Sequence, residues 1–383
     1  MPNADRSATV GRTSKNDVAR QRFSRLREVI DLGTGSAGII TDLADVRWLT
    51  SFSGSNGWLF VDRDDMVLLT DGRYTAQARS QIELSGANAS VIECSNQAAM
   101  IETCANLLGT QPKVQFQDRQ ISYQLFRSLE AAVSGELTPM DLSAKYLRRF
   151  KDDQEIALIE RACRIADRAL ADCVSLLAQR VTECALRDEL EYKMRQFGAD
   201  GPSYDTIVAT GPINAARPHH APTTTIIEEG HTVIIDVGAL VEGYHSDMTR
   251  SFVVGNMNSE QRLAYEAVAA AQAAGVAQLR SGMPVAEIDS ACRQVLREAG
   301  LAEFFTHGTG HGVGLVIHEE PFINSTASEI LRPGDVVTVE PGVYRGGFGG
   351  LRVEDLLVVT ENGSRTLNTF PKDPTCPPLQ PTI

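Results

Sequence analysis

The chain has 383 residues, of which 43% are hydrophobic, and a formal net charge of −13 at neutral pH. This length is large for one hydrophobic core, so we expect two domains. The acidic balance disfavours nucleic acid or an anionic membrane as a partner, because both attract basic surfaces. No apolar run is long enough to predict a membrane span.

The N-terminal segment is polar and lacks the apolar middle of a signal peptide, so we expect a disordered extension over residues 1–22. The seven cysteines are odd in number and form no CxxC motif. This usage indicates buried thiols in a reducing compartment, and therefore a cytoplasmic protein.

Residues 23–146 alternate short apolar runs with polar, helix-forming segments, which predicts an α/β domain. Two apolar runs, 58–61 and 66–69, flank the charged segment 62–65, a pattern typical of a β-hairpin. Residues 114–116 predict a further strand.

A helix is predicted to begin near Asp152, where acids suit the positive end of the helix dipole. Apolar residues then recur in steps of three and four from Ile156 to Leu177, which defines one buried face. This helix opens a second domain over residues 147–383. The last dozen residues are rich in proline, which predicts a non-helical tail.

The second domain contains an internal repeat. Segment 230–238 recurs as 334–342, with a glycine, an acid and a second glycine at the same places and an offset of 104 residues. The start of a predicted helix at Thr182 recurs at Pro284, and His219 recurs as His318. Because helix, histidine and acid recur in the same order, we expect two copies of one helix–hairpin unit.

Acids occupy matching places in the two copies. Asp236 and Glu340 each end an apolar, β-branched run, where a lone carboxylate is costly, and Asp247 and Glu354 follow on the next strand-like runs. In a hairpin, the two acids of a copy can face each other closely enough to share an ion. Singly, each acid could be a solvated hairpin residue, but together they predict a dinuclear metal site. Arg352 would share the strand face of Glu354 and orient an acidic ligand.

All seven histidines lie between His219 and His318. His307 and His311 belong to a glycine-rich run, 305–318, in which backbone can approach a bound group closely. The run lacks the Gly-Lys-Ser/Thr ending of a phosphate-binding loop. The role of His220 stays open at this stage, because it follows His219 and would point the other way in an extended segment.

These motifs resemble those of the pita-bread metallopeptidases, which include methionine aminopeptidase, Xaa-Pro aminopeptidase and Xaa-Pro dipeptidase (prolidase). The resemblance spans about residues 147–370. It implies an α+β protein whose C-terminal domain has two pseudo-symmetric helix–hairpin halves around a curved antiparallel sheet. Five residues match the metal ligands of this family: Asp236, Asp247, His311, Glu340 and Glu354.

The resemblance implies a role for each ligand. Asp247 and Glu354 would bridge two divalent ions, Asp236 would bind one ion, and His311 and Glu340 would bind the other. Oxygen ligands with one imidazole favour Mn²⁺, with Co²⁺ and Zn²⁺ as alternatives. Glu340 would also carry a proton from the nucleophile to the leaving nitrogen.

The resemblance extends to residues around the metals. His219 and His318 match two catalytic histidines on the substrate side, and His307, Arg352 and Tyr344 match residues that surround the site.

Segments 46–57 and 69–74 resemble the smaller creatinase/prolidase N-terminal domain, although Trp48 and Ser51 replace the usual tyrosine and glycine. The resemblance is greatest to small bacterial Xaa-Pro aminopeptidases. It implies a homodimer that cleaves peptides with proline at the second position. The alternatives are an Xaa-Pro dipeptidase and a non-catalytic peptide-binding protein of the same fold.

Overall fold

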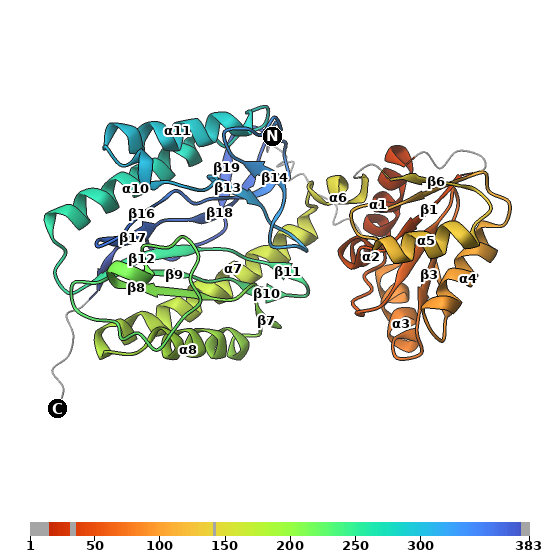
Figure 1. Cartoon of the computed structure of the whole chain (residues 1–383), viewed down its shortest axis with the longest axis horizontal. Helices are drawn as coiled ribbons and strands as arrows, with labels where there is room; N and C mark the ends of the chain where they lie inside the picture. Colours follow the sequence, from red (N-terminus) through yellow and green to blue (C-terminus); the bar gives the residue numbers. More distant parts are fainter. Residues whose placement is uncertain (1–14, 31–35, 141–142, 377–383) are drawn as a thin grey trace, which may run out of the picture. The chain divides into compact units, whose positions relative to one another are not determined.

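A computed structural model describes residues 15–30, 36–140 and 143–376 (Figure 1). The chain forms two compact units that divide between Arg148 and Arg149. No helix within the described ranges is both long and apolar enough to cross a membrane.

The N-terminal unit begins with helix α1 (Lys15–Val29). Residues 15–22, which were expected to be disordered, belong to this helix, and Val18 and Ala19 are buried in it. An apolar face therefore begins inside a segment that is polar on average. The rest of the expected extension, 1–14, lies outside the described residues.

A six-stranded sheet forms the centre of this unit, in the order β4-β3-β2-β1-β5-β6. The predicted hairpin is confirmed, since β2 (Trp58–Val61) pairs antiparallel with β3 (Met66–Thr70). Asp62 stabilises the turn, because its carboxylate accepts hydrogen bonds from the N–H groups of Asp64 and Asp65. The other elements are β1 (Ser36–Ile40), α2 (Leu43–Thr50), α3 (Thr75–Ser85), β4 (Ala89–Glu93), α4 (Gln97–Leu108), β5 (Lys113–Phe116), α5 (Tyr123–Ala132), β6 (Glu136–Pro139) and α6 (Ser143–Arg148).

The C-terminal unit opens with the predicted helix, α7 (Asp153–Cys173). The Asp152 carboxylate accepts hydrogen bonds from the N–H groups of Gln154 and Glu155, and the Glu155 side chain accepts one from the Asp152 N–H. This capping box satisfies backbone donors that have no partner inside the helix.

Two copies of one arrangement follow, as the sequence repeat predicts. In both copies, three strands are adjacent in the same order and two helices cover them (Figure 1). The first copy contains α7, α8 (Glu183–Gln196), β8 (Ile207–Thr210), β9 (Thr232–Asp236) and β12 (Thr249–Val254). The second contains α10 (Ser259–Gln278), α11 (Val285–Glu298), β13 (Gly310–Gly312), β15 (Val336–Val339) and β18 (Asp355–Val359).

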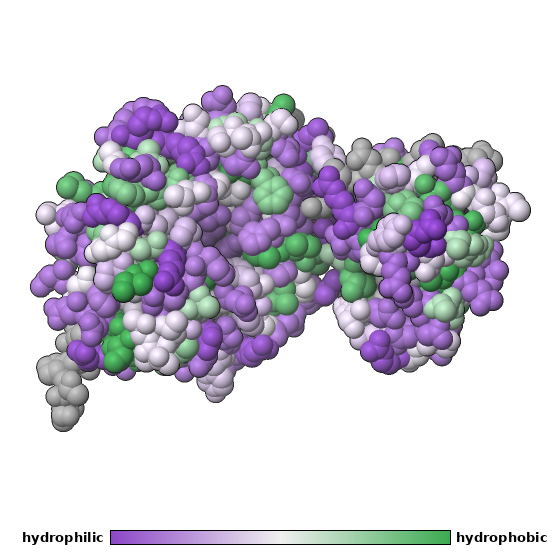
Figure 2. All heavy atoms as spheres, viewed as in Figure 1, coloured by the Kyte–Doolittle hydropathy of each residue, from purple (hydrophilic) through white to green (hydrophobic). Residues whose placement is uncertain are grey.

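The duplication extends to single contacts. Thr182 forms an isolated β-bridge with Ile226 just before α8, and Pro284 forms one with Ile330 just before α11. Each copy has its own apolar core, enclosed between its helices and its strands. Figure 2 shows a largely hydrophilic recess on the visible face of this unit.

Shorter elements connect these parts. They are η1 (Val174–Gln179), β7 (Gly201–Pro202), α9 (Gly211–Asn214), β10 (Ala239–Val241), β11 (Tyr244–His245), η2 (Ala302–Phe304), β14 (Glu319–Ile323), β16 (Gly342–Arg345), β17 (Gly349–Arg352), β19 (Ser364–Thr366) and β20 (Thr375–Cys376).

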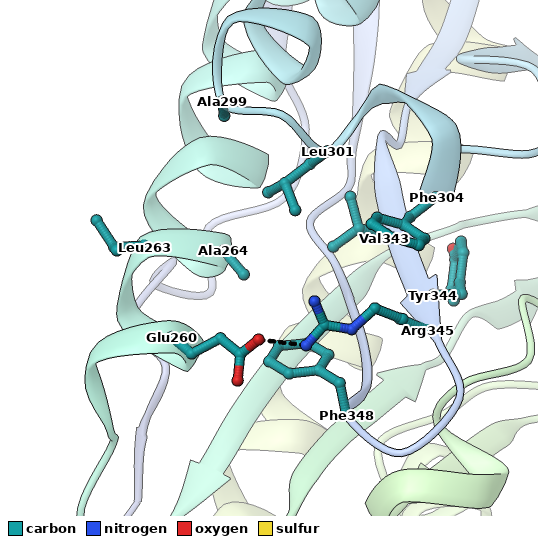
Figure 3. Close-up of a pocket in the computed structure, with 10 residues that line it drawn as sticks. All are labelled: Glu260, Leu263, Ala264, Ala299, Leu301, Phe304, Val343, Tyr344, Arg345 and Phe348. Carbon is teal, nitrogen blue, oxygen red and sulfur yellow. Dashed lines mark hydrogen bonds and ion pairs between the residues drawn. The ribbon is translucent and has the colours of Figure 1, made fainter.

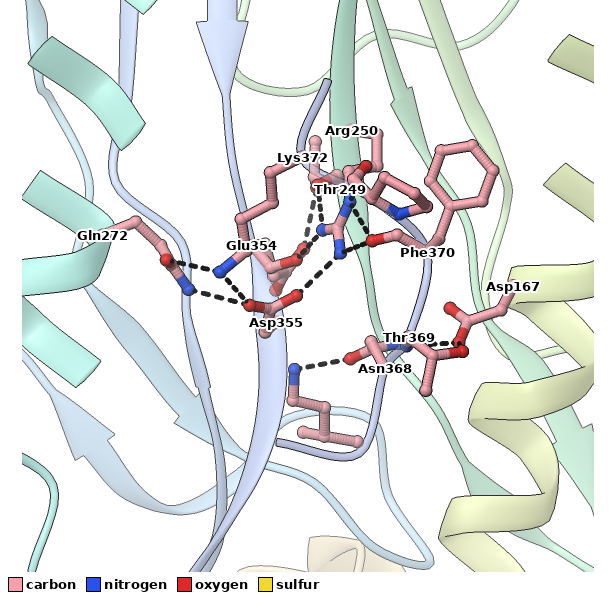
Figure 4. A network of polar contacts seen from close by, with 12 residues as sticks. Asp167, Thr249, Arg250, Gln272, Glu354, Asp355, Asn368, Thr369, Phe370 and Lys372 are labelled. Atoms are coloured by element: carbon pink, nitrogen blue, oxygen red, sulfur yellow. Dashed lines mark hydrogen bonds and ion pairs between the residues drawn. The ribbon is translucent and has the colours of Figure 1, made fainter. Parts of the chain in front are cut away.

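A buried polar network joins the two copies to the C-terminal segment (Figure 4). Arg250 of β12 donates from Nη2 to Asp355 Oδ1 of β18 at 2.8 Å and to the Phe370 carbonyl at 2.7 Å. Lys372 pairs with the other oxygen of Asp355. Arg250 Nη1 also donates to the carbonyl oxygen of Glu354. The network therefore holds the backbone of a predicted ligand where the two copies meet.

Candidate metal centre

The five predicted metal ligands lie at or beside strand ends. Asp236 ends β9, Asp247 precedes β12, and His311 lies in β13. Glu340 follows β15 and Glu354 precedes β18. The four acids therefore come from corresponding places in the two copies.

The structure brings these side chains together. One ligand atom from each of Asp247, His311 and Glu354 lies within 4.8 Å of the other two. His311 Nε2 lies 3.5 Å from Asp247 Oδ2 and 3.6 Å from Glu340 Oε1. The ladder register places Asp236 opposite Thr249, so its partner acid Asp247 lies diagonally across the hairpin and not directly opposite.

Tyr204 links the two acids of the first copy. Its hydroxyl contacts Asp236 and lies 2.6 Å from Asp247 Oδ1. A phenol hydroxyl has one hydrogen, so it can donate to only one of the two carboxylates. The negative charges of the two carboxylates therefore require a proton or a cation between them. Sequence reasoning missed Tyr204, because it lies outside any strand and outside the repeat.

The buried carboxyl groups resist ionisation. Burial raises the pKa values of Asp247 and Glu354 well above those of ordinary carboxyl groups. Neighbouring carboxylates raise both pKa values further. Burial also raises the pKa of Glu340. Four carboxyl groups and one imidazole form a donor set that suits hard divalent cations, and the positive charge of such ions would offset this repulsion. The residues present therefore fit a divalent metal site.

His311 has the tautomer that a metal ligand requires. Its Nδ1–H donates to the Gly312 carbonyl at 3.0 Å, because a carbonyl oxygen can only accept. Burial lowers the pKa of His311, which favours the neutral ring. The lone pair of Nε2 therefore faces the carboxyl groups of Asp247 and Glu340.

Arg352 contacts one of the acids predicted as ligands. The sequence places it on the strand face of Glu354, but its guanidinium donates to Asp236 Oδ2 at 2.6 Å. Thr249 links Arg352 to Glu354. Its hydroxyl accepts a hydrogen bond from Arg352 at 2.9 Å and donates one to Glu354 Oε2 at 2.7 Å. Arg352 therefore orients acids of both copies.

His307 and Tyr344 extend this network. His307 Nδ1–H donates to the Gly308 carbonyl at 2.8 Å, so Nε2 accepts from the Tyr344 hydroxyl at 2.9 Å. Arg352 donates to the same hydroxyl at 2.8 Å. Burial lowers the pKa of His307 and raises the pKa of Tyr344 to about 12, so both groups are neutral near pH 7.

The two histidines expected on the substrate side are both exposed. The His318 ring packs edge-on against His311, with centroids 4.4 Å apart. His219 follows Pro218, whose carbonyl accepts a hydrogen bond from Arg352 Nη1 at 2.9 Å. His318 thus borders the carboxylate cluster, and the segment that carries His219 is tied to it.

A cavity of about 310 Å³ lies between α10 and the β16–β17 hairpin (Figure 3). Arg345 lies at this cavity, where it pairs with Glu260 and contacts the rings of Phe304 and Phe348. The lining is mostly apolar and offers no cluster of metal ligands among its residues. It consists of Glu260, Leu263, Ala264, Ala299, Leu301, Phe304, Val343, Tyr344, Arg345 and Phe348.

Comparisons with known proteins place this arrangement in a family. Residues 157–361 match the model of metallopeptidase family M24, and residues 22–149 match the creatinase/prolidase N-terminal domain. An uncharacterized peptidase of Bacillus subtilis, YqhT, is 38% identical over 338 residues, which are 88% of this chain and 94% of that protein.

Solved structures show the same likeness. A Bacillus anthracis Xaa-Pro dipeptidase has a TM-score of 0.88 at 32% identity, over 94% of this chain and 99% of that one. An X-Pro aminopeptidase from Thermotoga maritima has a TM-score of 0.84 at 30% identity, over 92% of this chain and 99% of that one. The chain thus belongs to metallopeptidase family M24 and combines its pita-bread domain with a creatinase/prolidase N-terminal domain.

Proposed function

We propose that the protein is an Xaa-Pro aminopeptidase, which hydrolyses the bond before a proline at the second position of a peptide. The observation that carries this proposal is the buried cluster of Asp247, His311 and Glu354, with Asp236 and Glu340 beside it, in a chain of family M24. Similar structures include both an Xaa-Pro dipeptidase and an aminopeptidase. The N-terminal motifs at 46–57 and 69–74 favour the aminopeptidase.

The proposed cofactor is a pair of divalent ions, with Mn²⁺ preferred because the donors are mostly oxygen atoms. Asp247 and Glu354 would bridge the ions, Asp236 would bind one, and His311 and Glu340 the other. When bound, such ions polarise the scissile carbonyl and activate water. A homodimer and a cytoplasmic location remain predictions from the sequence.

The chain's own residues would complete the reaction. Glu340 would take a proton from the attacking water and deliver it to the proline nitrogen, which must be protonated to leave. The raised pKa of Glu340 supports this role, because a buried carboxyl group holds a proton more readily than an exposed one. His219 and His318 would hydrogen-bond the substrate and its tetrahedral intermediate at the exposed edge of the centre.

The proposal is tested by hydrolysis of two substrates in the presence of added Mn²⁺, an Xaa-Pro dipeptide and an Xaa-Pro-Yaa-Zaa tetrapeptide. An aminopeptidase releases Xaa from the tetrapeptide. Cleavage of the dipeptide alone would identify a prolidase, which needs the free carboxylate next to proline. Cleavage of neither substrate would favour the non-catalytic peptide-binding protein.

A further inference from the structure

The residue after each exposed histidine is buried and contacts a buried partner. His220 Nε2 lies 3.0 Å from Glu183 Oε2, with side-chain exposures of 5% and 0%. In the second copy, Glu319 Oε1 lies 2.6 Å from Lys151 Nζ, and both side chains are 1% exposed. Buried charges require such partners. In both copies, the residue that follows the histidine matched by the sequence repeat is thus held by a buried partner.

Glu183 fixes the segment that follows His219. It is the first residue of α8, where the helix dipole favours an acid. Besides His220, its carboxylate accepts from the Thr210 N–H at 2.8 Å, from the Thr223 N–H at 2.9 Å and from the Thr223 hydroxyl at 2.7 Å. The main chain on the C-terminal side of His219 is thus attached to α8.

The N-terminal side of His219 is fixed to the metal centre. The Pro218 carbonyl accepts a hydrogen bond from Arg352, which also donates to Asp236. His219 is therefore an exposed side chain between two held neighbours, Pro218 and His220. Such an arrangement limits the backbone torsions on both sides of a residue that must meet a substrate.

Glu319 has the corresponding position in the second copy. It opens β14 and pairs in register with Gly312 of β13, next to His311. Its partner Lys151 lies just before α7, so the ion pair attaches β14 to the start of the unit. His318, one residue before Glu319, is thereby held with its ring against His311.

We propose that His220 and Glu319 are positioning residues. The hydrogen bond of His220 to Glu183 and the ion pair of Glu319 with Lys151 hold His219 and His318 so that the imidazoles face a peptide at the metal centre. This inference rests on the proposed function, which gives those two histidines their contact with the substrate.

A double-mutant cycle separates positioning from general stability. With the Mn²⁺-loaded full chain and a cleaved Xaa-Pro peptide, His220→Ala should lower kcat/KM roughly tenfold, because catalysis is sensitive to small misplacements. In a His219→Ala background, the same change should cost less than about twofold, because the two residues act through one interaction. His220→Gln, whose amide can donate to Glu183, should recover most of the loss.

The matched control is His231→Ala. His231 belongs to the same copy and lies 3.9 Å from Glu228, but this pair is partly exposed. The kcat/KM of His231→Ala should equal that of the wild type. Glu319→Gln with and without His318→Ala forms the corresponding cycle for the second copy. Only variants with wild-type far-UV circular dichroism and metal content enter the comparison.

Equal losses from His220→Ala in both backgrounds, or no loss in either, would overturn the inference while leaving Xaa-Pro hydrolysis intact. A second readout does not need activity. NMR relaxation of the His219 imidazole should show a more mobile ring in His220→Ala than in wild type or His231→Ala. An unchanged ring would reject positioning, even if the wild-type protein cleaved no Xaa-Pro peptide and the proposed function had failed.

Discussion

Three of the predicted ligands contact the hydroxyl group of a residue that is not a predicted ligand. Asp236 and Asp247 share Tyr204, while Glu354 accepts from Thr249. These hydroxyl groups fix where the carboxylates point before any ion arrives. Outer partners of this kind raise metal affinity because they orient the ligands.

The Tyr204→Phe variant tests this dependence. Loss of the hydroxyl removes a contact of both Asp236 and Asp247, so we expect roughly tenfold weaker Mn²⁺ binding, measured by isothermal titration calorimetry. Tyr192→Phe, at an exposed position on α8, is the control and should bind like wild type. Unchanged affinity in Tyr204→Phe would show that the hydroxyl does not prepare the site.

A substrate-side residue should behave differently from a ligand. His318→Ala should lower kcat by about a hundredfold, as removal of an interaction made in the transition state does, and should retain its metal. Turnover and metal content measured on one preparation provide the check. Loss of metal would instead make His318 a ligand and contradict its assignment.

The sequence indicated charged residues of the centre more readily than uncharged ones. Asp236 and Glu340 were predicted because each ends an apolar run at a repeated position, where a lone carboxylate is costly. Asp247 and Glu354 were predicted because each lies on the strand-like run that follows. Tyr204 and Thr249 gave no such signal, since hydroxyl-bearing residues are common in loops and strands. Arg352 was predicted beside the acids, but the sequence did not identify Asp236 as its partner, because strand alternation does not show which way a long side chain turns.

At the scale of elements, neighbouring strands of the two copies carry the ligands, and a buried network holds these strands together. The Glu354 N–H donates to the Thr249 carbonyl at 3.1 Å, which joins β18 to β12 directly. Arg250 and Asp355 complete the junction with the buried ion pair shown in Figure 4. The repeat predicted the strands but not this junction, because these contacts connect residues about a hundred positions apart.

Removal of Asp355 tests the junction. Asp355→Ala leaves Arg250 and Lys372 without their shared carboxylate, so we expect a loss of about 3–5 kcal/mol in the free energy of unfolding. Urea titration followed by circular dichroism measures it. Arg365→Ala, which breaks a partly exposed pair with Glu160, should cost about 1 kcal/mol or less. Equal costs would mean that the buried network contributes no special stability.

At the scale of the whole molecule, the duplication explains where the candidate metal centre lies. Each copy places two acids at corresponding strand ends, and the four carboxyl groups lie where the two copies meet. Periodic apolar residues predicted α7, and the repeat predicted the paired copies, because both patterns reflect burial. The helix α1 was missed, since only a few buried side chains distinguish it from a polar extension.

Metal and pH should act together on stability. The folded protein has raised carboxyl pKa values at Asp247, Glu340 and Glu354, so at intermediate pH it binds more protons than the unfolded chain. Stability of the metal-free protein therefore falls as pH rises through this interval. Divalent ions bind the ionised groups, so the rise in Tm caused by Mn²⁺ should be larger at about pH 8 than at about pH 5.

Calorimetric scans with EDTA and with Mn²⁺ at the two pH values measure this difference. Glu160→Gln, which removes a partly exposed carboxylate on α7 that is not one of the predicted ligands, should leave the difference unchanged. A rise in Tm of equal size at both pH values would indicate that these carboxyl groups do not control metal binding.

The most direct test is the number of Mn²⁺ ions bound per chain at saturation, measured by equilibrium dialysis of the wild type and of Glu354→Ala. Two ions are expected in the wild type, because the centre offers ligands for a pair. The variant should lose both ions and all hydrolysis while its N-terminal unit stays folded. Fewer than about one ion per wild-type chain, or a fully active Glu354→Ala enzyme, would contradict the dinuclear centre on which the proposed activity depends.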